Sequence, residues 1–414
     1  MLIIYFFFLQ FFIPQPQEDS ISVSQAVSQA ISRSLSLKQQ TAYLKAGFYQ
    51  SLQDVSPDKP TVSFYTEEML NGPNEIQSVN RWQISQKFEF PLVYLAKINR
   101  LDHLSNAMDY ELEEMKVGLA FQVRVLYWEV KLRESLLQIS REGLEMAESF
   151  QKSTEKLFEF GEVSKLQALR AKIEVEKAKS KLFDAQKSLE SIQFQFLIVV
   201  GDSLKKQLTD SFQNAIPNLK LTDLLRFGET FHPKSKKLES KKLAASELKS
   251  AAVFSLFPSI SFSYFSQKFT PSDNTSQRFA GGEVSLSFPL WAWLGDRGSI
   301  GEKSNVEDAL RYEYEYWREI QQKQITSSFK QYEINRTQLL EMQSLLIPAS
   351  EEGFRLAISK YEKGEIGYLE LLDSRSVVLE SKELLVTKQF EVMKSYAELL
   401  KSIGKIEEEI NENK

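Results

Sequence analysis

The sequence contains no cysteine among its 414 residues. Disulfides, thiolate metal sites, cysteine nucleophiles and an acylated N-terminal cysteine are therefore excluded. Glycine and proline are sparse, at 16 and 12 residues, while 26% of the residues are charged. Most of the chain can therefore form regular structure, and little of it resembles a disordered tract.

Excess positive charge and catalytic motifs are missing as well. The formal net charge is −5, and basic and acidic residues are interspersed, so there is no basic stripe for a phosphate backbone. The two histidines, His103 and His232, have no metal or triad spacing, and single helical histidines are usually surface groups. No GxGxxG or GxxxxGK[ST] motif occurs. We expect no enzyme activity, no cofactor, no metal and no nucleic-acid partner.

Long apolar runs are absent after Ile13, where no window approaches the 18 residues of a membrane-spanning helix. The N-terminal "MLIIYFFFLQFFIP" has the length of a signal-peptide hydrophobic region, and we expect residues 1–19 to be a signal peptide. No Lys or Arg precedes this run and no small-x-small cleavage site follows it. A misassigned start or a membrane anchor are the alternatives.

The sequence does contain an internal repeat. "EFGEVSKLQALRA", from Glu159, returns as "EKGEIGYLELLDS", from Glu362, 203 residues later. Upstream, "FEFPL" at Pro91 and "LSFPL" at Pro289 lie 198 residues apart, so the second copy gains five residues, which we place in "WAWLGDRGSIG". Self-similarity at a fixed offset indicates a tandem duplication. The predicted copies are residues 20–218 and 219–404, followed by a polar tail at 405–414.

Each copy predicts a helix, two short strands, a long helix, a glycine turn and a returning helix. In the first copy we expect a helix over 21–56, a strand over Thr61–Leu70 and a second strand ending at Phe90; "SISFSYFSQKF" and "GEVSLSF" are the strands of the second copy. Apolar and aromatic residues form one face of these strands, and serine and charged residues the other. A soluble sheet would bury the apolar face on the chain's own core, whereas a transmembrane barrel would turn it toward lipid.

The long helices favour the second alternative. Residues 95–158 contain no proline and have apolar residues every three or four positions, which predicts a helix of about 96 Å. The counterpart over 299–361 is broken only by Pro348, where we expect a kink. Ordinary globular cores need no such length. Four strands cannot close a barrel, so a barrel would need several chains.

The returning helices have a strict seam of apolar residues. In the first copy, small residues at Ala171, Ala178 and Ala185, followed by Ile192, alternate with larger ones at Val175, Leu182, Leu189 and Phe196. A 3.5-residue repeat is the pattern of a coiled coil. We therefore expect Gly161 and Gly364 to be the turns at which each long helix folds back on itself.

In this order and duplication of elements, with "FPL" at both strand-to-helix passages and "YEKGEIGYLELLDS" at the second turn, the chain resembles the TolC family of outer-membrane efflux proteins from Ile21 to Gly404. The resemblance implies a mostly α fold with a small β part. It implies a homotrimer whose strands close one twelve-stranded transmembrane β-barrel in the outer membrane of a Gram-negative-type bacterium, above a long periplasmic α-helical barrel.

The function implied by the resemblance is passive conduction of small toxic substrates, metal ions or drugs, as the outer-membrane channel of a tripartite efflux system. Its partners would be outer-membrane lipid, a periplasmic adaptor (membrane fusion protein) and an inner-membrane transporter. A type I protein-secretion duct is the alternative within the family. A soluble periplasmic coiled-coil scaffold or adaptor is the alternative outside it.

The resemblance also implies site residues near the turns. Glu370 and Asp373 match the acidic constriction of the pore, Tyr361 matches a gate contact, and Gln167 stands where an acid is common. Three copies of each acid would attract cations, although a carboxylate near a helix N-terminus is also favourable by itself. Ile366 replaces an expected basic gate residue.

The turns themselves would dock the adaptor. The positions that match are Gly161, Glu162, Ser164, Gly364, Glu365 and Gly367. A glycine can adopt the left-handed conformation of a tight turn and leave room for a partner. Turn geometry alone is the alternative explanation for both glycines.

Overall fold

The computed structural model describes residues 20–70, 76–202, 206–212, 217–271, 275–292 and 295–406. The chain divides into two compact units. Unit 1 comprises Met1–Leu35, Lys116–Gly228 and Lys323–Lys414, and unit 2 comprises Ser36–Met115 and Glu229–Gln322. The predicted signal peptide and most of the predicted tail lie outside the described residues.

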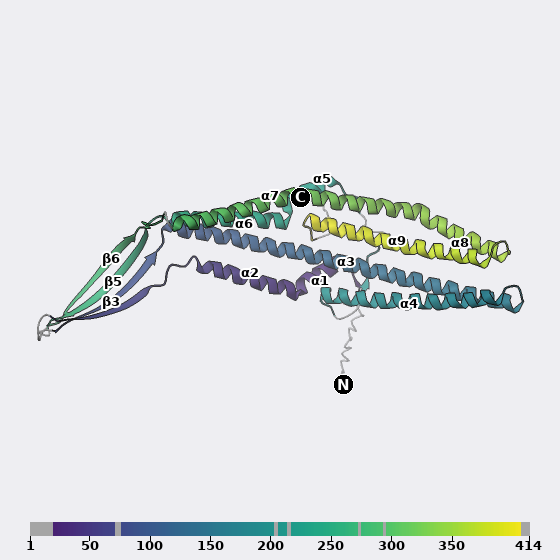
Figure 1. Cartoon of the computed structure of the whole chain (residues 1–414), viewed down its shortest axis with the longest axis horizontal. Coiled ribbons are helices and arrows are strands. Elements are labelled where there is room, and N and C mark those ends of the chain that lie inside the picture. Colours follow the sequence, from purple (N-terminus) through teal and green to yellow (C-terminus); the bar gives the residue numbers. More distant parts are fainter. Residues whose placement is uncertain are drawn as a thin grey trace, which may run out of the picture. The chain divides into compact units, whose positions relative to one another are not determined.

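The order of elements is the same in both copies, as the repeat predicted (Figure 1). The first copy contains α1 (Val23–Arg33), α2 (Leu35–Gln53), β2 (Thr61–Leu70), β3 (Ile76–Phe88), α3 (Pro91–Glu159) and α4 (Lys165–Val200). The second contains α5 (Leu221–Phe231), α6 (Pro233–Phe254), β5 (Ser259–Thr270), β6 (Gln277–Ser287), α7 (Asp296–Glu341), α8 (Ile347–Glu362) and α9 (Tyr368–Ser402). Within the described ranges, no helix has the length and hydropathy needed to cross a membrane.

The expectation of one helix over residues 21–56 is wrong, because the chain breaks at Ser34 between α1 and α2. The second copy breaks at the equivalent position, His232, between α5 and α6. His232 is also not a surface group: its side chain is 6% exposed, and its Nδ1 accepts a hydrogen bond from the Lys234 amide at 3.1 Å. It therefore caps α6, with Pro233 in the first helical turn.

The predicted interruption of the second long helix is confirmed. Between α7 and α8 lies a π-helical turn, Met342–Leu346, which ends two residues before Pro348. Proline lacks an amide hydrogen and its ring collides with the carbonyl four residues earlier. A π-turn relieves that collision by widening the helix locally.

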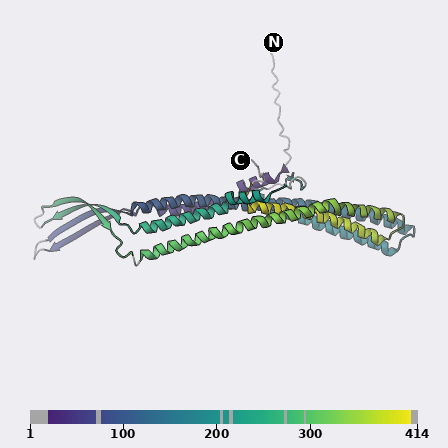
Figure 2. The ribbon, with the colours of Figure 1, turned by 90° about the horizontal axis from the view of Figure 1, so that it is seen from above.

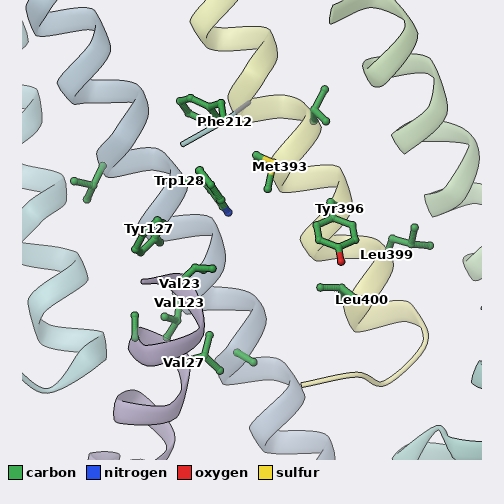
Figure 3. Packing of buried hydrophobic residues seen from close by; sticks show 14 of the residues in the cluster. Val23, Val27, Val123, Tyr127, Trp128, Phe212, Met393, Tyr396, Leu399 and Leu400 are labelled. Atoms are coloured by element: carbon green, nitrogen blue, oxygen red, sulfur yellow. The ribbon is translucent and has the colours of Figure 1, made fainter. Parts of the chain in front are cut away.

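The core of unit 1 brings together helices that are distant in sequence (Figure 3). Val123, Tyr127 and Trp128 of α3 are at most 1% exposed and pack in one cluster with residues of α1 and α9, which include Val23, Val27, Met393, Tyr396, Leu399 and Leu400. Tyr127 also reaches α4, where its ring centroid lies 6.0 Å from that of Phe196.

Contacts within unit 1 also hold the first described residues, Ser20 and Ile21, in place. The two-residue strand β1 (Ser20–Ile21) pairs in parallel with β4 (Gln207–Leu208). The Tyr127 hydroxyl donates a hydrogen bond to the Ile21 carbonyl at 3.1 Å and accepts one from the Asp210 amide at 3.0 Å. Burial raises the pKa of Tyr127, so the phenol stays protonated and keeps its donor.

The returning helices form hairpins with the helices before them. In the second hairpin, α8 and α9 run side by side in both views (Figures 1 and 2). In the first hairpin, the buried residues of α4 include Ala171, Val175, Ile192 and Phe196. These four residues lie on the predicted seam. The coiled-coil prediction for α4 is therefore confirmed.

The sheet of unit 2 is antiparallel, in the order β2-β3-β5-β6. All four predicted strands are confirmed. Each register pair joins two odd-numbered or two even-numbered residues, such as Phe64 with Trp82 and Ile84 with Tyr264. The sheet therefore has one side with odd-numbered side chains and one side with even-numbered side chains.

The even side is apolar in the half of the sheet that contains Val62 and Leu286, and these side chains are not covered by the chain. Eight of them are 50–65% exposed, namely Val62, Phe64, Trp82, Ile84, Phe262, Tyr264, Val284 and Leu286. A soluble sheet would bury them on its own core. The described chain therefore does not bury this apolar side on a core of its own.

The expected uniform faces are correct for only that half of the sheet. In the other half, the even side carries Ser266, Lys268 and Arg278, and the odd side carries Phe265 and Phe269. Apolar and polar side chains thus exchange sides along the length of the strands.

Candidate functional site: the hairpin tips of unit 1

The first tip is a glycine turn between α3 and α4. Gly161 has a φ of +76°, and the Glu162 amide donates to the Leu157 carbonyl at 2.9 Å. This bond spans five residues, which requires a left-handed residue after the helix end. Glycine adopts that conformation without the steric cost of a Cβ atom.

The start of α4 is fixed by a reciprocal cap. The Ser164 hydroxyl accepts a hydrogen bond from the Gln167 amide at 3.3 Å, and the Gln167 side-chain oxygen accepts one from the Ser164 amide at 2.9 Å. Such a capping box satisfies two amide donors that the helix leaves free. Gln167, expected at the gate, therefore has a structural role at this helix end.

The second tip has the same turn and a different cap. Gly364 has a φ of +74°, and the Glu365 amide donates to the Lys360 carbonyl at 2.9 Å. Gly367 occupies the N-cap of α9 and offers no side-chain acceptor. The turn geometry predicted for both glycines is confirmed, while the two helix starts differ.

A cavity of about 1040 Å³ lies between the two tips, within unit 1. Its walls come from α3, α4, α8 and α9, and they include five of the expected site residues: Glu162, Gln167, Tyr361, Gly364 and Gly367. Ile366, which replaces the expected basic residue, is also in the wall. The fold thus brings together parts of both repeats.

An aromatic cluster forms one wall of this cavity. The Phe150 ring stacks on Tyr368 with centroids 4.8 Å apart, and lies 5.7 Å from the ring of Tyr361. Tyr368 is 4% exposed, and its hydroxyl has no hydrogen-bond partner in the described part of the chain. Burial raises the pKa of Tyr368 and of Tyr361, so both phenols are neutral.

Ion pairs connect α9 to the first hairpin. Arg375 Nη2 lies 3.3 Å from Glu174 Oε2 on α4. Two further pairs join α9 to the first hairpin, Lys382 with Glu142 at 2.9 Å and Lys181 with Glu383 at 2.6 Å. Sequence reasoning missed these contacts and the Phe150–Tyr368 stack, because their partners are more than 200 residues apart and belong to no motif.

The remaining site residues lie outside the cavity wall. Glu370 and Asp373 are exposed on α9, and within the described residues neither forms an ion pair. Gly161, Ser164 and Glu365 belong to the turns without lining the cavity. Among the described residues, no group of His, Asp and Glu could hold a metal ion. The site offers shape, aromatic surface and charge.

The sequence and the structure of the chain were compared with those of known proteins. The sequence model of the outer membrane efflux protein family matches residues 26–196. A comparison with curated protein sequences gives no significant match.

Among solved structures, the chain is similar to the outer-membrane channel OprN, with a TM-score of 0.77 and 20% identity over 92% of this chain and 89% of OprN. It is similar to the transmembrane channel CusC, with a TM-score of 0.77 and 17% identity over 92% of each chain. The outer-membrane protein VceC of Vibrio cholerae gives a TM-score of 0.74 and 13% identity over 92% of this chain and 96% of VceC. At these identities the likeness demonstrates the fold, and it extends over both repeats.

Proposed function

We propose that this chain, whose residues 26–196 match the outer membrane efflux protein family and whose fold is that of outer-membrane channels, is the outer-membrane channel of a tripartite efflux system. Three copies assemble, and their twelve strands close one barrel in the outer membrane. Their helices form a periplasmic duct. The channel conducts solutes passively and catalyses no reaction, while an inner-membrane transporter supplies the energy through a periplasmic adaptor.

The observation that carries this proposal is the exposed apolar band on the even side of the sheet. Side chains such as Trp82, at 58% exposure, would cost free energy in water and gain it in lipid. Within the described residues, β2 and β6 each leave one edge unpaired. In hydrocarbon those edges must pair, and the strands of further copies can pair with them.

A second exposed seam on α4 supports the assembly. Opposite its buried seam, α4 presents Leu166, Leu169, Ile173 and Phe183, which are 50–67% exposed and keep the spacing of a coiled coil. A helix with two apolar seams is suited to two neighbours. The first neighbour belongs to the same chain, and we assign the second to another copy.

The hairpin tips would form the gate of the duct and the surface on which the adaptor docks. The stack of Tyr361, Phe150 and Tyr368 and the ion pair of Arg375 hold α9 against the first hairpin, while exposed Glu370 and Asp373 would line the constriction in the trimer. The adaptor would dock on both turns, at Gly161, Glu162, Ser164, Gly364, Glu365 and Gly367. Gln167 contributes to the gate through the cap of α4.

The substrates are proposed to be small toxic solutes, metal ions or drugs. A type I protein-secretion duct remains the second candidate within the family, since its passive duct would have the same architecture. The uncovered aromatic side of the sheet disfavours a soluble scaffold.

Fractionation of cells tests the proposal. We expect the protein in the outer membrane, released by detergent as a heat-sensitive trimer. Its deletion should sensitise cells to a panel of toxic metals and drugs. A monomer released in soluble form by osmotic shock would contradict the channel.

A further inference from the structure

The odd side of the unit 2 sheet is the more sheltered one. Along β5, the odd-numbered side chains from Ser261 to Phe269 are half-buried, while the even-numbered ones from Phe262 to Lys268 are exposed. The same trend holds in β6, where Gly281 and Ser285 are less exposed than their neighbours. A sheet that curls toward its odd side produces this difference, because side chains on a concave surface crowd one another.

Half of this sheltered side is lined by serine and glutamine together with Lys87 and Glu283, and the other half holds an aromatic and cationic row. Tyr65 on β2 pairs directly with Arg81 on β3. The Arg81 guanidinium carbon lies 4.1 Å from the ring centroid of Phe265 on β5, which is close enough for a cation–π interaction. Phe265 in turn pairs with Gly281 on β6. The row thus crosses all four strands.

Gly281 leaves the space into which the Phe265 ring packs. A Cβ atom added at Gly281 would lie 2.9 Å from Phe265 Cζ and 3.0 Å from its Cε1. No real side chain tolerates so short a contact, so the ring depends on glycine at this position. Aromatic packing over a strand glycine also fixes strand register. The Phe265 ring therefore packs against Gly281 and also contacts the Arg81 guanidinium.

Arg81 has spare hydrogen-bonding capacity. Its Nε is buried and has no hydrogen-bond partner, and within the described residues the side chain forms no ion pair. The carboxylate nearest in the register is Glu67 on the same side of β2, and it accepts a hydrogen bond from the Tyr65 hydroxyl. A guanidinium that is partly removed from water and not neutralised attracts carboxylates and phosphates strongly.

We propose that Arg81, seated on Phe265 over Gly281, forms a fixed cationic ring on the inner wall of the barrel and selects for anionic groups, such as carboxylates and phosphates, on exported solutes. This inference rests on the proposed trimer, in which the concave odd side faces the lumen. Three guanidinium groups would then project into one narrow aqueous passage. Rings of fixed charge in narrow passages set the ion preference of pores.

The test measures the reversal potential of the purified trimer in planar bilayers under a KCl gradient. Arg81→Gln should shift the permeability ratio toward cations by ~2-fold or more. Glu67→Gln should shift it toward anions, because it removes the opposing charge. The matched control is Lys268→Gln, which removes an equal charge from the exposed even side and should leave the ratio unchanged.

A second variant covers the case in which Arg81→Gln does not assemble. Gly281→Ala retains every charge but displaces the Phe265 ring, so the permeability ratio should shift toward cations, as it does in Arg81→Gln. Trimers of either variant with wild-type selectivity would overturn the filter while leaving the channel intact. If wild-type protein forms no channel at all, the proposed function fails instead.

Discussion

Arg375 on α9 and Glu174 on α4 form an ion pair between the two hairpins of unit 1, with Nη2 and Oε2 3.3 Å apart. Their side chains are only 12% and 21% exposed, so solvent screens the pair weakly. A helical hairpin that closes a duct must be held by contacts that can be broken. This pair, beside the Tyr368–Phe150 stack, is suited to that role.

Arg375→Gln should loosen α9 from α4. A hydrogen bond between charged groups contributes about 2 kcal/mol, so the arrangement seen here should become roughly 30-fold less favoured relative to an open one. Distances between spin labels on α9 and α4 should lengthen or broaden, and single-channel conductance should rise. Lys179→Gln is the control, since the Lys179–Glu176 pair lies within one exposed helix face. Unchanged label distances in Arg375→Gln would remove the pair from the gate.

Tyr368→Phe tests the buried hydroxyl in the tip cavity. Because this hydroxyl has no partner in the described chain, its removal should leave stability unchanged or raise it by up to about 1 kcal/mol. Thermal denaturation in detergent measures the effect, and Tyr127→Phe serves as the contrast because the Tyr127 hydroxyl makes two hydrogen bonds. A clear loss of stability in Tyr368→Phe would mean that the hydroxyl is bonded in the assembled protein.

Neutralising Glu370 and Asp373 together tests the acidic constriction. The double change to Gln and Asn keeps the shape of both side chains and should weaken cation preference in single-channel recordings. Glu176→Gln removes a 65% exposed carboxylate from α4 and provides the control. If selectivity is the same in the double variant, both acids act only as favourable charges at the N-terminus of α9.

The local structure was largely predictable from the sequence. The positive φ angles of Gly161 and Gly364 follow from a helix that must reverse, and the strands follow from alternation of period two. The breaks at Ser34 and His232 were not predicted. In the first copy no proline marks the break, and only Pro233 in the second copy, aligned through the repeat, could have revealed it.

The site was less predictable, because its contacts join distant segments. The seam of α4 could be seen in its heptads, whereas the Phe150–Tyr368 stack depends on how two hairpins meet. The exchange of apolar sides in the sheet was visible in principle, since Phe265 and Phe269 have the opposite parity to Phe262. Its meaning emerged only with the three-dimensional structure, in which the Arg81 guanidinium reaches diagonally from β3 to the Phe265 ring on β5.

His232 makes unit 2 sensitive to acid. Burial lowers its pKa to about 4, the neighbouring Glu114 opposes the shift and Lys234 adds to it. A folded-state pKa below the unfolded value of about 6.5 means that the unfolded chain binds more protons, so stability is full above pH 6.5 and falls as the pH drops toward 4. The loss at pH 5 relative to pH 7 should be about 2 kcal/mol.

The melting temperature of wild type and His232→Asn at pH 7 and pH 5 measures this effect. Asparagine retains an acceptor for the α6 cap and cannot titrate, so the variant should lose less stability on acidification. Equal losses in both proteins would show that other groups cause the acid sensitivity.

Ion conductance of the purified protein in a planar lipid bilayer, with no energy source present, would show whether the protein forms a passive channel. We expect discrete, ohmic conductance steps from detergent-purified trimers, because in the proposed barrel the exposed side of the strands containing Trp82 and Tyr264 would face lipid and the sheltered side would enclose water. Protein that stays monomeric in plain buffer and leaves the bilayer silent would contradict it.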